Sequence, residues 1–455
     1  MATAIQQVEG YLENFGEFEK LAAGRELPWL RKLREEAFAR FCQVGFPTTH
    51  DEDWRFTNVS ALANTSFKLA AENSGALTAA DLEQWKVAGA GAQLVFVNGH
   101  FSRELSSIGE LPEGVSVSSL AESLTADPHL VERHLGAYLN VGRDAFAALN
   151  TAFAQDGASI HIAKNAALEQ PIHLLFVTVT AGEPLMSHPR NLIVAGEASE
   201  ATILEDYVSI GEGTAFCNTV TELVATDGAV ISHYMVEREN GNAFNVSTLR
   251  VQQGRSANVA SHSVLLGGGL VRNNVHPVLA GEGGECLING LFIGNGRQHL
   301  DNYMLVEHAS PHSESRQFYN GILDGNAHGV FHGRIVVHKD AQKTDAKQTN
   351  RNLLLSDDAQ IDTKPQLEIY ADDVKCTHGA TIGQIDENAL FYLRSRGIDE
   401  VSARKLLLLA FANECLDRMK PGAVRTHVEQ LIGDHLLSFA TAVPVQRVEG
   451  EDNGR

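Results

Sequence analysis

The 455-residue sequence is poor in cysteine, in positive charge and in long apolar runs, and each shortage argues against a class of protein. Its five cysteines are scattered and form no CxxC pair, which argues against a disulfide framework or a four-thiolate site and suits a reducing cytosol. The net charge of −21 disfavours binding to nucleic acid or to an anionic membrane. The longest apolar run, Leu406 to Ala412, is too short to span a bilayer, and we see no secretory signal. We therefore expect a cytoplasmic protein without nucleic-acid or membrane partners.

Two further absences bear on catalysis. The glycine-rich stretches at 267–269 and 281–284 lack the GxxxxGK[ST] pattern of a phosphate-binding loop, so ATP chemistry would have to come from a partner. The sequence also lacks the GxSxG pattern of a nucleophile elbow. We expect a protein that is not an enzyme.

What the sequence does contain changes in character along the chain. Hydrophobic residues make up 44% and charged residues 20%, as in a folded globular protein. The patterns predict an N-terminal helical region (1–66), a mixed α/β lead-in (67–155), a β-rich core (156–385), a C-terminal helical domain (386–445) and a disordered tail (446–455).

Within the β-rich core, a turn followed by a small residue recurs. Ala201, Ala229, Ala257 and Cys286 are separated by steps of 28, 28 and 29 residues. A nearly fixed period of this length is typical of stacked coils in a solenoid, and two-residue hairpin turns are scarce. The expected fold is mainly β: a right-handed parallel β-helix flanked by helical regions.

One pair of side chains near the end of this core has metal-binding chemistry. Cys376 and His378 are two residues apart, so on a strand both point to the same face. A thiol and an imidazole are ligands that a soft or borderline metal accepts. Free cysteine is also among the most frequently buried residue types, so spacing alone leaves a structural role open for both residues.

The sequence around this pair resembles the SufB/SufD family of iron–sulfur cluster assembly scaffolds, most closely its D-type members. The resemblance rests on four segments: RNLLLS (351–356), AxIDTKPxLEIY (359–370), VKCTHGATIG (374–383) and FYLRSRGI (391–398). It implies a parallel β-helix that pairs with a SufB-like subunit and works with a SufC-like ATPase. A transient iron–sulfur cluster would form where the two β-helices meet.

The resemblance also assigns roles to individual residues. It implies that His378 is a cluster ligand, and we expect burial to keep this imidazole neutral. Cys376 is either a second ligand or a core residue. Two departures from the B-type pattern, Ser356 in place of a cysteine and Gly379 in place of a glutamate, identify this chain as the D-type partner.

The C-terminal helical domain is expected to dock the ATPase. The segment from Leu406 to Leu409 continues an apolar pattern that nearly encircles its helix, which predicts burial against both the β-helix and a partner. No cofactor is expected to be bound permanently, although the resemblance links the assembled complex with a flavin. The residues predicted to dock the ATPase are Arg396, Gly397, Ile398, Leu406, Leu409 and Phe411.

Two alternatives remain open. The first is a carbohydrate-active β-helix enzyme, which would usually be secreted and would carry a cluster of acidic and basic residues on one solenoid face. The second is a homodimeric β-helix interaction protein without a metal role. A homodimer is also possible for a D-type subunit when it is alone.

Overall fold

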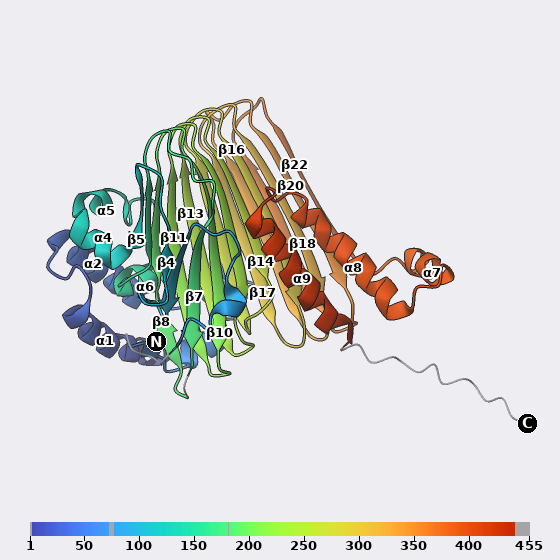
Figure 1. Ribbon diagram of the computed structural model, residues 1–455, viewed down its shortest axis with the longest axis horizontal. Coiled ribbons are helices and arrows are strands. Elements are labelled where there is room, and N and C mark those ends of the chain that lie inside the picture. Colours follow the sequence, from blue (N-terminus) through green and yellow to red (C-terminus); the bar gives the residue numbers. More distant parts are fainter. Residues whose placement is uncertain (1, 72–76, 140, 143, 181, 442–455) are drawn as a thin grey trace, which may run out of the picture.

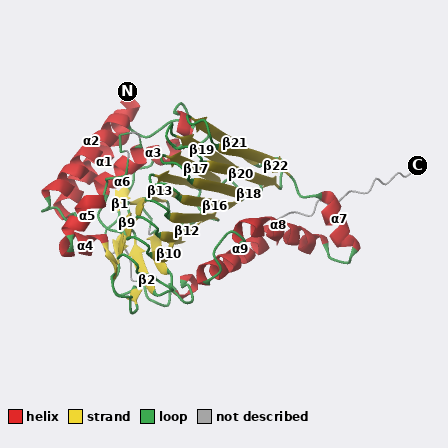
Figure 2. Ribbon diagram, turned by 90° about the horizontal axis from the view of Figure 1, so that it is seen from above, coloured by secondary structure: helices red, strands yellow, loops and turns green. Residues whose placement is uncertain are grey.

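The computed structural model describes residues 2–71, 77–139, 141–142, 144–180 and 182–441, so the predicted tail at 446–455 lies outside the described residues. The predicted fold is confirmed: the chain forms a parallel β-solenoid, with helices in the N-terminal and C-terminal regions (Figure 1). From Arg190 onward, successive strands alternate between two sheets, and each strand pairs in parallel with the strand two places along the chain. Figure 2 shows the strands stacked along one axis between the two helical regions.

Each sheet has 11 strands in the described part of the chain. The first sheet, sheet A, contains β1 (Lys68–Leu69), β5 (Val115–Ser119), β6 (Ala158–Ile162), β8 (Leu185–Ser187), β9 (Arg190–Ala195), β11 (Ala215–Ala225), β13 (Ala243–Gln253), β15 (Leu270–Leu279), β17 (His299–His308), β19 (His328–Val337) and β21 (Gln360–Ile369). The second, sheet B, contains β2 (Ala92–Val97), β3 (His100–Phe101), β4 (Ser107–Ile108), β7 (Ile172–Val179), β10 (Glu200–Ile210), β12 (Val230–Arg238), β14 (Asn258–Leu265), β16 (Glu285–Gly294), β18 (Glu314–Leu323), β20 (Asp345–Leu354) and β22 (Lys375–Gly383).

The coil length varies more than the sequence repeat predicts. In sheet B, pairing advances by 30 residues (200 to 230), then 28 (230 to 258), then 27 (258 to 285). Only the middle step equals the predicted one; Ala201 pairs with Ile231, two residues beyond the predicted Ala229. A shift of two residues leaves every side chain on the same face, because side chains alternate along a strand. The inward-facing positions form one continuous core cluster along the solenoid.

Most of the N-terminal helices cover the outer face of sheet A, whereas the short helix at Glu83–Trp85 packs on strands of sheet B. Phe15 and Phe38 stack with ring centroids 4.1 Å apart, and Phe153 lies 5.6 Å from Phe15. This aromatic cluster extends to Phe216 and Val246 on β11 and β13. The helices of this region are α1 (Ala2–Leu21), α2 (Pro28–Val44), η1 (Glu52–Trp54), α3 (Ser60–Asn64), η2 (Glu83–Trp85), α4 (Leu120–Ala126), α5 (Pro128–His134) and α6 (Ala145–Phe153).

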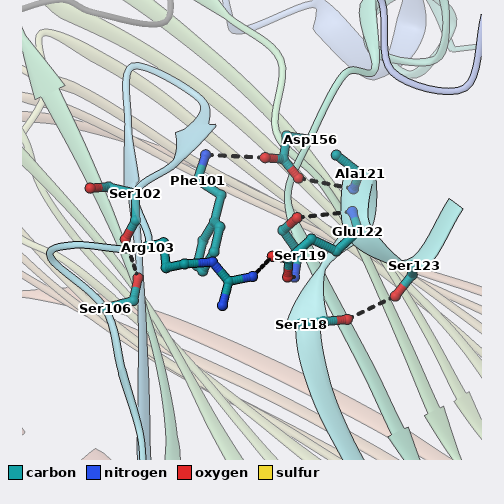
Figure 3. A network of polar contacts seen from close by, with 10 residues as sticks. All are labelled: Phe101, Ser102, Arg103, Ser106, Ser118, Ser119, Ala121, Glu122, Ser123 and Asp156. Carbon is teal, nitrogen blue, oxygen red and sulfur yellow. Dashed lines mark hydrogen bonds and ion pairs between the residues drawn. The ribbon is translucent and has the colours of Figure 1, made fainter. Parts of the chain in front are cut away.

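A buried carboxylate joins the lead-in region to the first coil. Figure 3 shows Asp156 accepting hydrogen bonds from the backbone N–H groups of Phe101 on β3 and Ala121 on α4, at 3.1 and 3.2 Å. The backbone N–H of Gly157 also donates to it, at 2.9 Å. Burial raises the pKa of Asp156, although the three backbone donors oppose this effect. Asp156 therefore fixes three otherwise separate segments at the first coil.

The C-terminal helices are α7 (Glu387–Ser395), α8 (Glu400–Leu416) and α9 (Ala423–Thr441). Helices α8 and α9 lie on the outer face of sheet B, and α7 extends away from the solenoid (Figures 1 and 2). None of the described helices combines the length and hydropathy needed to cross a membrane.

One buried ion pair ties the N-terminal region to the solenoid. Arg190 Nη2 lies 2.5 Å from Glu222 Oε1, and both side chains are almost completely buried. Glu222 also accepts a hydrogen bond from the backbone N–H of Gly136, at 2.7 Å. Arg190 in turn donates to Asn150 and Thr151 of α6, at 3.0 Å in each case.

We expect Glu222→Gln to lower the free energy of unfolding by about 3–5 kcal/mol, because Arg190 would keep its charge in a buried site without a counter-ion. Urea unfolding of the purified chain measures this. The matched control is Glu197→Gln, which removes an exposed pair with Lys164 (2.8 Å) and should cost less than about 1 kcal/mol. Equal effects of the two substitutions would contradict the assigned role of Glu222.

Candidate functional site

The predicted pair Cys376 and His378 lies on β22, the last strand of sheet B. In the parallel ladder Cys376 is opposite Ala346 and His378 is opposite Gln348. Cys376 is half-buried and packs against the solenoid core, so the face that it shares with His378 is the inward one. The structure therefore places both side chains at the final coil.

Strands β21 and β22 form this final coil, which we call the open end. Among the described strands, β21 pairs only with β19 and β22 pairs only with β20. Each therefore presents a free row of backbone N–H and C=O groups, a template onto which another chain's strands can pair. Three large apolar side chains are exposed at this end: Ile369, Tyr370 and Ile382.

The environments of the two candidate ligands differ. Burial raises the pKa of the Cys376 thiol, so the chain on its own favours the protonated sulfur, which is the weaker ligand. His378 is exposed. The expectation that His378 is buried is therefore wrong for the chain on its own, because no further coil of the described chain covers the open end.

The donors available at the open end are few. No group of three or more His, Cys, Asp or Glu side chains with metal-binding geometry occurs in the described part of the chain. Ser356, in the turn after β20, donates its hydroxyl to the Gly325 carbonyl at 2.7 Å. A Cβ built on Gly379 would meet no atom within 4 Å, so packing alone does not require glycine there. Cys376 and His378 would need ligands from outside this chain to complete a four-coordinate iron site.

The six predicted docking residues separate into two groups. Arg396, Gly397 and Leu406 are exposed. Leu409 and Phe411 are half-buried and pack against the solenoid, and the guanidinium of Arg351 lies 5.6 Å from the centre of the Phe411 ring. Ile398, the remaining member, is half-buried in the turn between α7 and α8.

Two exposed aromatic side chains on α7 were not among the predicted site residues. Phe391 is 74% exposed and Tyr392 is 57% exposed. Arg396 lies over the Tyr392 ring, with its guanidinium carbon 5.1 Å from the ring centre. In the sequence, this exposed aromatic pair could have been found from the adjacent Phe and Tyr at the start of the FYLRSRGI segment. Together with Leu406 on α8, they give the helical domain an exposed apolar surface.

Below α9, sequence reasoning also missed a buried polar cluster. Asp206 is fully buried and accepts two hydrogen bonds from Arg238, at 3.0 and 2.5 Å, and His173 lies 3.5 Å from it. Burial alone would raise the pKa of Asp206, but the Arg238 charge and the His173 contact lower it to about 2. His427 on α9 faces this cluster, and burial lowers its pKa to about 4. The only signal in the sequence was a pair of adjacent acidic residues, Glu205 and Asp206, inside the otherwise apolar stretch of β10 from Ile203 to Val208.

Comparison with known proteins identifies the class to which this fold and site belong. Residues 176–411 match the family described as SUF system FeS cluster assembly, SufBD core domain, and residues 5–174 match the SufBD protein N-terminal region. The chain belongs to the SufBD family of iron–sulfur cluster assembly proteins.

Individual relatives cover most of the chain. An iron–sulfur cluster assembly SufBD family protein of Synechocystis is 34% identical over 91% of this chain and 93% of its own length. The iron–sulfur cluster assembly protein SufD of Escherichia coli is 31% identical over 88% of this chain and 92% of its own length. The iron–sulfur cluster assembly protein SufD of Bacillus subtilis is 25% identical over 95% of this chain and 98% of its own length.

The lowered pKa of Asp206 predicts an acid-sensitive contribution to stability. Because the folded pKa of about 2 lies below the ordinary value of 3.8, the stabilisation is fully present above pH 4 and is lost as the pH falls toward 2. Asp206→Asn should remove roughly 2 kcal/mol at pH 7 and flatten the pH dependence of unfolding between pH 4 and 2. Urea unfolding measured as a function of pH gives both quantities.

The control for this measurement is Asp227→Asn, which removes an exposed carboxylate 3.8 Å from Arg255. It should leave the pH dependence as in the wild type. An Asp206→Asn protein that kept the wild-type acid sensitivity would show that another group is responsible.

Proposed function

We propose that this chain is a non-catalytic scaffold subunit of an iron–sulfur cluster assembly complex in the cytoplasm. It pairs through its open end with a SufB-like subunit, and a nascent cluster forms at the junction. The observation that carries the proposal is the coincidence of two free strand edges with an exposed imidazole, His378, on the same final coil. Membership of the SufBD family supports this proposal over the carbohydrate-active alternative.

The free edges suit a partner that is itself a solenoid. A second β-helix with an open end can continue both ladders at once, so that its backbone groups satisfy those of β21 and β22. Exposed Ile369, Tyr370 and Ile382 would then be covered. Such a junction holds side chains from two subunits at a fixed separation, as ligand positioning requires.

At the junction, the cluster is cargo rather than a resident cofactor. His378 contributes one imidazole nitrogen, and Cys376 contributes its thiolate only where iron displaces its proton. The hydroxyl of Ser356 is a poor ligand for iron in a cluster, so the remaining thiolates come from the partner. A reduced flavin would act on the assembled complex rather than at a site in this chain.

The exposed part of the helical domain is the proposed docking surface for a SufC-like ATPase. Five exposed residues would form this surface: Phe391 and Tyr392 on α7, Arg396 and Gly397 in the turn after α7, and Leu406 on α8. Helix α7 extends away from the solenoid (Figure 1). Apolar and aromatic residues of this kind dominate the binding energy of protein interfaces. Leu409 and Phe411 support the surface from the side facing the solenoid.

A homodimer is the second candidate assembly. The same free edges of β21 and β22 are available in every copy of the chain, so two copies can pair at their open ends when no SufB-like subunit is present. Titration of a SufB-like subunit into the purified chain, followed by mass measurement, would distinguish the two, because the heteromer should form at the expense of the homodimer.

The function of His378 is tested by anaerobic cluster reconstitution on the complex with SufB-like and SufC-like subunits. We expect His378→Ala to leave the complex intact and to lower the cluster absorbance at least tenfold, because one iron loses its ligand. His129→Ala, which changes an exposed histidine on α5, is the control and should give the wild-type yield. Full cluster yield with His378→Ala would show that this chain is only an architectural partner.

The docking surface is tested by the substitution of one exposed leucine. Leu406→Ser should weaken binding of the SufC-like ATPase about tenfold, because burial of a leucine contributes about 1.5–3 kcal/mol. Calorimetric titration measures the affinity, and pairing with the SufB-like subunit should not change. Leu12→Ser, at a similarly exposed leucine on α1, is the control. Equal affinities for both variants would contradict docking at α8.

A further inference from the structure

A single column of inward-facing residues runs along sheet B to His378. Successive members are Cα partners in the parallel ladders, one from each coil. The last three members are Gln317 on β18, Gln348 on β20 and His378 on β22. Gln348 therefore lies one coil below the candidate cluster ligand, with its side chain on the same inward face.

The two glutamines form a buried amide ladder. Gln317 and Gln348 are 2% and 1% exposed, and Gln348 Nε2 donates to Gln317 Oε1 at 2.8 Å. The facing strand β19 makes room for this amide, because a Cβ built on Gly333 would lie 1.6 Å from Gln348 Nε2. The side chain of Gln348 is therefore held in place by a donor contact on one side and by a glycine on the other.

The second polar atom of this amide is unsatisfied. Gln348 Oε1 is buried and has no hydrogen-bond partner among the described residues. A buried acceptor without a donor is destabilising and uncommon in folded proteins, so its presence here requires an explanation. In the chain on its own, Gln348 Oε1 therefore accepts no hydrogen bond from His378, which is exposed at the open end. Covering the open end would confine the imidazole against the coil below.

We propose that Gln348 is a positioning residue for His378. When a partner covers the open end, Gln348 Oε1 accepts the imidazole N–H and so fixes one tautomer, leaving the lone pair of the other nitrogen for iron. This inference rests on the proposed role of His378 as a ligand.

The chemistry of the amide suits this task. Histidine ligands of metals generally donate their second ring N–H to an acceptor, which sets the ring orientation and the tautomer. Because Nε2 of Gln348 is already engaged by Gln317, the amide presents oxygen rather than nitrogen as its free atom. The acceptor is neutral, so it orients the ring without adding a charge beside the cluster.

The tautomer of His378 can be measured without a cluster. We would label the histidines with ¹⁵N, form the complex with a SufB-like subunit, and assign His378 by its absence in His378→Asn. Long-range ¹⁵N–¹H spectra then report which ring nitrogen carries the proton. The wild-type complex should show one tautomer, and Gln348→Met, which removes the acceptor at similar side-chain length, should show a mixture and a cluster yield lowered several-fold.

Two further variants distinguish positioning from packing. Gln348→Glu keeps an acceptor oxygen, and Gln317 Nε2, which lacks a partner among the described residues, can donate to it, so the single tautomer should be retained. Asn350→Leu is the control, because Asn350 is equally buried on β20 but lies opposite Ala380. It should keep the single tautomer even if its melting temperature falls as far as that of Gln348→Met.

If the Gln348→Met variant does not assemble, Gly333→Ala provides an independent test. The added methyl group would displace the amide of Gln348 without changing that residue. The Gly333→Ala complex should therefore also show a mixture of His378 tautomers. An unchanged tautomer in Gln348→Met or Gly333→Ala overturns the positioning role, whatever the cluster yield. Normal cluster yield with His378→Ala overturns the proposed ligand role instead, and the tautomer spectra still decide whether the amide contact exists. Failure of the wild-type chain to form any complex overturns both.

Discussion

The stacking of one coil on the next by parallel backbone pairing is the constraint on which the rest of this structure depends. Each inner strand has its N–H and C=O groups satisfied by the coil before it and the coil after it. The same pairing aligns side chains into columns, so that residues about 30 positions apart in sequence become direct neighbours. At the last coil the pairing stops while the columns continue to the surface. The open end therefore presents unsatisfied backbone and ordered side chains together, which is the combination that a two-subunit ligand site needs.

Much of this fold could be predicted from local sequence because the turns carry small residues at nearly regular intervals. The exact register could not, because the corners between strands differ in length and only the pairing itself shows where residues were added. Val230 and Asn258 are related by the predicted step, whereas Ala201 pairs two residues away from its predicted partner. Because a shift of two residues restores the same face, Ala229 and Ile231, the predicted and the observed partner of Ala201, both lie in the solenoid core.

In the candidate site, too, some features could be predicted from local sequence and others could not. That Cys376 and His378 share a face follows from strand alternation and needs no structure. That His378 is exposed depends on whether another coil follows, and no local pattern specifies that. Some predicted docking residues are exposed and others are half-buried, because a helix that is apolar nearly all round does not indicate which side contacts the solenoid. Phe411 lies on the side that faces the solenoid, whereas Leu406 is exposed. Gln348 resembles any other strand residue in sequence, and only the ladder places it below an imidazole.

The attachment of α8 has a mechanical consequence. Near its C-terminal end, the carbonyls of Phe411 and Cys415 accept hydrogen bonds from Asn320 and Asn289 of sheet B, at 2.8 and 2.9 Å, and Glu414 pairs with Arg351 of β20. Its N-terminal half and α7 extend from the solenoid (Figure 2). A helix that is clamped to the sheet at one end and extends beyond the sheet at the other behaves as a cantilever. A load applied at α7 would produce its greatest bending moment at the clamp, and Arg351 would pass that moment to the strand that pairs directly with β22.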